Sequence, residues 1–73
     1  MKSRTFEVGK IVGQIQGALD NEIPRPMWGK LSQFAKDQNE QVIEELISCI
    51  ELYVPEKSIK GTILMNLEGF LSQ

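Results

Sequence analysis

The segment that most constrains the fold is residues 39–54, NEQVIEELISCIELYV, in which apolar side chains recur every three or four positions. They form two adjacent stripes: Val42, Leu46, Cys49 and Tyr53, and beside them Ile43, Ile47, Ile50 and Val54. The opposite side is polar: Asp37, Glu40, Glu44, Ser48 and Glu51. Two stripes at helical period make an apolar face wider than one neighbour could cover. The pattern predicts the central helix of a small bundle.

Three other segments show the same period. Residues 5–20 place six apolar side chains on one side: Val8, Ile11, Val12, Ile15, Ala18 and Leu19. The second stripe is Met27, Trp28, Leu31, Phe34 and Ala35, and the third is Ile59, Ile63, Leu67 and Phe70. Each interior glycine of the first segment costs a helix about 1 kcal/mol relative to alanine, so two short strands over residues 5–16 are the alternative. The period favours helices throughout.

Turn and capping residues predict where these helices begin and end. The prolines of residues 20–26 predict a loop, with Pro26 in the first turn of the second helix. Asp37 followed by Glu40 resembles a capping box and predicts that the third helix begins there, although one bent helix over the second and third segments is the alternative. Ser58 is the expected N-cap of the last helix. The predicted fold is an all-α bundle of about four short helices with antiparallel neighbours.

Size and composition exclude several classes of protein. A chain of 73 residues is one domain near the lower limit for a single hydrophobic core. One cysteine and no histidine exclude an internal disulfide and an ordinary zinc site, so an oligomeric partner is expected. No apolar run approaches the ~20 residues of a membrane span. The N-terminal MKSRTFEVG has no apolar segment behind its charges, so we expect a cytoplasmic protein without a secretory signal.

The residues that usually carry chemistry are missing. Without histidine there is no Ser/His/Asp or Cys/His arrangement. Cys49 lies on an apolar stripe and is expected to act as a small core residue. Glu40, Glu44 and Glu51 share one helix face, which is more typical of a solvated surface than of a cation site. No glycine-rich segment has the spacing of a phosphate loop. We therefore expect no enzyme, no cofactor and no metal.

The charges divide unevenly along the chain, whose net charge is −2. Residues 1–36 contain six basic against three acidic side chains, whereas residues 37–73 contain two against seven. The two halves are expected to attract each other within one bundle or simply to form solvated faces, with head-to-tail pairing of subunits as the alternative. Arg25, Lys30 and Lys36 surround Trp28 and Phe34 in the sequence, and together with Lys10 they also suggest contact with nucleic acid or another partner. A core or interface role for Trp28 is the favoured alternative. Against a helix-turn-helix, the predicted third helix has four glutamates and no basic residue.

Glycines recur every fourth position in the first predicted helix, at Gly9, Gly13 and Gly17. Together with Phe6 they lie opposite that helix's apolar stripe, and we call these four residues the glycine face. Glycines at this spacing let another backbone approach closely. The expectation is that the glycine face docks a second helix, most simply in a two-fold dimer. Glycines that face water, or a close helix crossing within the monomer, are the alternatives.

The function that fits these features is a non-enzymatic module that binds another protein or itself. By analogy of size and charge alone, it resembles phage or accessory-genome proteins that inhibit a larger complex by occupying a surface. One alternative is a helical subunit of a nucleoprotein assembly that contacts the nucleic-acid backbone through its basic half. The other is a small-molecule-binding bundle with a cleft lined by the glycines or by Trp28.

Overall fold

The structure is a computed structural model that describes residues 4–72. Four helices occupy this range: α1 Arg4–Ala18, α2 Arg25–Lys36, α3 Glu40–Tyr53 and α4 Lys57–Leu71. Residues 4–72 contain no strand, which confirms the predicted all-α bundle and rules out short strands over residues 5–16. None of these helices is both long enough and apolar enough to cross a lipid bilayer.

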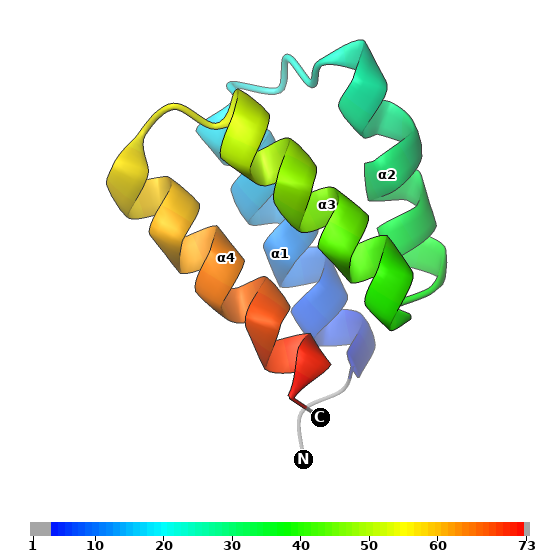
Figure 1. Ribbon diagram of the computed structural model, residues 1–73. Helices are drawn as coiled ribbons and strands as arrows, with labels where there is room; N and C mark the ends of the chain where they lie inside the picture. The colour runs from blue at the N-terminus through cyan, green and yellow to red at the C-terminus, as the bar shows by residue number, and fades with distance from the viewer. Residues whose placement is uncertain (1–3, 73) are drawn as a thin grey trace.

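The helices alternate in direction, so that consecutive helices are antiparallel (Figure 1). Each packs on two neighbours in a closed ring, α1 on α2, α2 on α3, α3 on α4, and α4 on α1. The most extensive contacts are those of α3 with α2 and α4. The helix with the widest apolar stripe is therefore the main packing element of the bundle.

The core is entirely apolar within the described residues and draws on all four helices. Its members are Val8, Ile11, Ile15, Met27, Leu31, Phe34, Ile43, Leu46, Ile50, Val54, Ile63, Leu67 and Phe70. The rings of Phe34 and Phe70 meet edge to face, with centroids 5.7 Å apart, an arrangement that suits the aromatic quadrupole. The remaining stripe residues of α3, Cys49 among them, are half-buried at its edges.

Three residues of the predicted apolar stripes lie at the surface instead of in the core, and the small Ala35 is one of them. Trp28 is 56% exposed and Ile59 is 42% exposed. Trp28 directly follows the buried Met27, and about 100° per residue turns it to the flank of α2 that faces α1. Ile59 lies in the first turn of α4. The residues just before this helix supply few side chains that could cover it. Both side chains border surface grooves described below.

The loop between α1 and α2 contains a tight left-handed turn. Asp20 and Asn21 adopt φ values of 52° and 63°, a region that Asn and Asp tolerate better than other residues with side chains. The Asn21 N–H donates to the Gln16 carbonyl at 2.8 Å and so satisfies a carbonyl at the end of α1. Pro26 lies in the first turn of α2, as predicted.

The predicted capping box at Asp37 and Glu40 is wrong. Asn39 is the N-cap of α3, and its Oδ1 accepts the N–H of Val42 at 2.9 Å. Asp37 has an extended backbone, with φ −147°, and is the C-cap of α2. Because Asn39 is the last extended residue before α3, its side chain reaches the free N–H groups, which Asp37 is too far away to cap. Helices α2 and α3 are therefore separate.

The predicted N-cap of α4 is also wrong, because Ser58 already lies inside the helix. Glu56 is the cap, and its carboxylate accepts the N–H groups of Ser58 at 3.0 Å and Ile59 at 2.9 Å. The hydrogen bond from the Ile59 N–H has the largest effect and, with that from Ser58, lowers the pKa of Glu56 below its ordinary 4.5. A longer side chain thus performs the capping that Ser58 was predicted to perform.

Candidate interaction surfaces

The glycine face of α1 is open to solvent. Gly9, Gly13 and Gly17 are all exposed, and a methyl group added at any of them would have no neighbouring atom within 4 Å. Phe6, on the same side, is 62% exposed. The alternative of a close helix crossing within the monomer is therefore wrong. The glycines leave a smooth outer surface along α1 that nothing in residues 4–72 covers.

A groove of about 380 Å³ lies between the end of α1 and the beginning of α4. It is lined by Gln14, Gly17, Ala18, Ser58, Ile59, Thr62 and Ile63. Below the groove, Asn66 Nδ2 donates to Gln14 Oε1 at 2.9 Å and ties the two helices together. Gly17 is the member of the glycine face that borders this groove, where its missing side chain widens the opening.

A second groove, of about 400 Å³, lies between α1 and α2, and we call it the Trp28 groove. Its lining is Val12, Gln16, Ile23, Trp28, Leu31, Ser32 and Ala35, none of which is charged. The Trp28 indole N–H donates to the Ile23 carbonyl at 2.7 Å. This bond fixes the ring against the loop before α2 while leaving more than half of the side chain exposed.

Lys30 lies on the opposite flank of α2, where it faces α3. Its Nζ is 2.8 Å from Glu45 Oε1, and Gln41 donates to the other oxygen of that carboxylate at 3.2 Å. Hydrogen bonding to Glu45 and its charge raise the pKa of Lys30, and the same bond, with that from Gln41, lowers the pKa of Glu45. Both side chains are more than a third exposed, so the pair joins α2 to α3 but adds little stability.

The other predicted cations do not form one patch with Lys30. Arg25 and Lys36 are exposed in the first and last turns of α2, and spacing places them on its outer side next to Trp28. Lys10 is exposed on α1 at about 160° from Val12, so it points away from the Trp28 groove. The basic residues therefore lie on three different sides of the bundle. This dispersal does not favour a continuous track of phosphate contacts.

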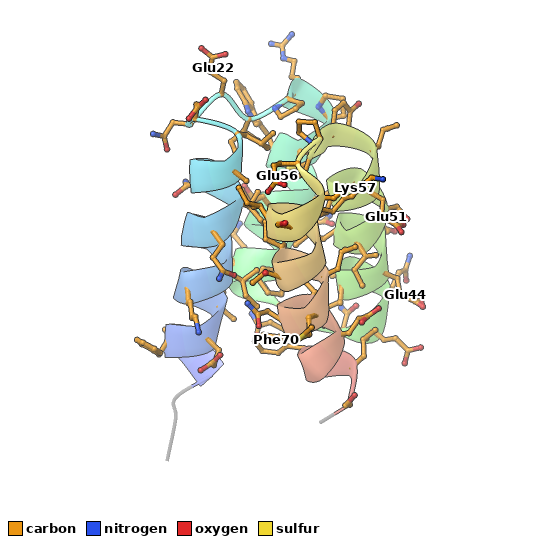
Figure 2. The ribbon with its side chains drawn as sticks, turned by 90° about the vertical axis from the view of Figure 1, so that its left-hand side faces the viewer. Glu22, Glu44, Glu51, Glu56, Lys57 and Phe70 are labelled. Atoms are coloured by element: carbon orange, nitrogen blue, oxygen red, sulfur yellow. The ribbon has the colours of Figure 1, made fainter. Side chains whose placement is uncertain are left out.

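The outer side of α3 is acidic. Figure 2 shows Glu44 and Glu51 pointing away from the bundle, and Glu40 is exposed on the same side. Among these acids Leu52 is 74% exposed. Residues 4–72 contain no cluster of three His, Cys, Asp or Glu side chains arranged to hold a metal ion. The glutamates are thus spread along a solvated surface.

Comparison of the chain with protein-family models, with curated proteins and with solved structures gave no match. The surfaces themselves therefore carry the functional argument. Sequence reasoning identified Trp28 and the glycine face but missed Met65, which is 71% exposed. A signal for Met65 existed, since it lies outside the apolar stripe of its helix.

Proposed function

We propose that the protein is a non-enzymatic interaction module, an adaptor or inhibitor of a larger complex, that docks another protein through the Trp28 groove. The observation that carries this proposal is the exposed Trp28 ring, held in place by its hydrogen bond to the Ile23 carbonyl. Exposed tryptophans held in one position are typical of residues that dominate the energy of protein interfaces.

The energy available at this position is considerable. A tryptophan side chain can bury about 250 Å², so the exposed 56% corresponds to about 140 Å². At about 25 cal/mol per Å², covering that area contributes about 3.5 kcal/mol before the entropic costs of association. Since the indole N–H already has an acceptor within the chain, covering the ring leaves no buried donor unsatisfied.

The surroundings of the ring suit an apolar side chain of a partner. Ser32 and Ala35 are small and exposed, so they leave room beside the ring along α2. Val12 and Leu31 supply apolar surface at the base of the groove. A groove with an apolar base and one fixed aromatic wall is the common form of a site that accepts a helix or an extended segment.

The test is site-specific photo-cross-linking in extracts of cells that express the protein. A photoreactive amino acid replaces Ala35 in the groove or, as the control, Leu52 on α3. We expect a discrete partner to cross-link from position 35 and not from position 52. The Trp28→Ala variant should capture the same partner at least 10-fold less well, while its circular dichroism spectrum stays that of the wild type. Equal cross-linking from both positions, or capture that ignores Trp28→Ala, would refute the proposal.

A further inference from the structure

We draw no further inference here: the strongest candidate, the exposed groove between the end of α1 and the beginning of α4 that Gly17, Ile59 and Thr62 help to line, carries none because nothing in the structure shows what covers it.

Discussion

Replacing Gly13 by alanine should stabilise the isolated chain. Gly13 lies in the interior of α1, is exposed, and has no atom within 4 Å of the position that the new methyl group would occupy. The substitution therefore adds no clash and removes backbone freedom from the unfolded chain. From helix propensity, the expected gain in unfolding free energy is about 1 kcal/mol.

Urea unfolding followed by circular dichroism measures this gain. It is performed at a protein concentration low enough that sedimentation velocity shows monomers, because dimer formation would add its own stability. For a domain of this size, about 1 kcal/mol should raise the melting temperature by about 4 to 8 °C. With an m-value near 1 kcal/mol/M, the urea midpoint should rise by about 1 M.

Gly29→Ala is the matched control, since Gly29 is also an exposed, interior helical glycine with open space around it. Both variants should gain similar stability as monomers. If Gly29→Ala stabilises the chain while Gly13→Ala leaves it unchanged or weakens it, then the outer side of α1 is not the open helical surface described above.

Three further outcomes test the fold. Leu46 has 0% exposure, so Leu46→Ala should lower the free energy of unfolding by about 2 to 5 kcal/mol. That is a large part of the total of roughly 4 to 11 kcal/mol expected for a chain of this length. A urea midpoint near that of the wild type would contradict the burial of Leu46 in the core. Asn39→Ala should cost about 1 kcal/mol by removing the N-cap of α3, as measured in the same assay. The pKa of Glu56 is lowered in the folded chain, so its ionised carboxylate contributes stability that is fully present above the ordinary pKa of 4.5. This contribution is lost as the pH falls through the lowered pKa of the folded state. Glu56→Gln should therefore flatten the decline of melting temperature below pH 4.5.

The sequence predicted the helices and most of the core because both depend on local periodicity. Ile43, Leu46 and Ile50 recur at helical spacing, and burying their stripe needs only neighbours with similar stripes. The separation of α2 from α3 was left open, because two hydrophobic periods in succession are compatible with one bent helix or with two. The non-helical residues 37–39 and the cap at Asn39 decide it in the structure.

The capping residues and the grooves were harder to predict because they depend on geometry beyond the period. Asp37 and Ser58 had suitable chemistry, yet each lay at the wrong distance from the first free N–H groups of its helix. Trp28 lies close enough to the apolar stripe of α2 on a helical wheel to be counted with it. In the structure, α1 packs so that Trp28 lies at the edge of the contact between α1 and α2. Its exposure follows from the packing of two helices, which no single segment encodes.

Several surface residues of the bundle do not improve the isolated chain. Three interior glycines of α1 together forfeit about 3 kcal/mol of helix propensity, although alanine would fit at each of them. Trp28 and Met65 leave large apolar areas in water, where polar side chains would serve the monomer better. Both features have a use once a second surface is present, because glycines admit a close neighbour and exposed apolar groups gain energy when covered. For Trp28, the second surface is the partner that we propose docks in its groove.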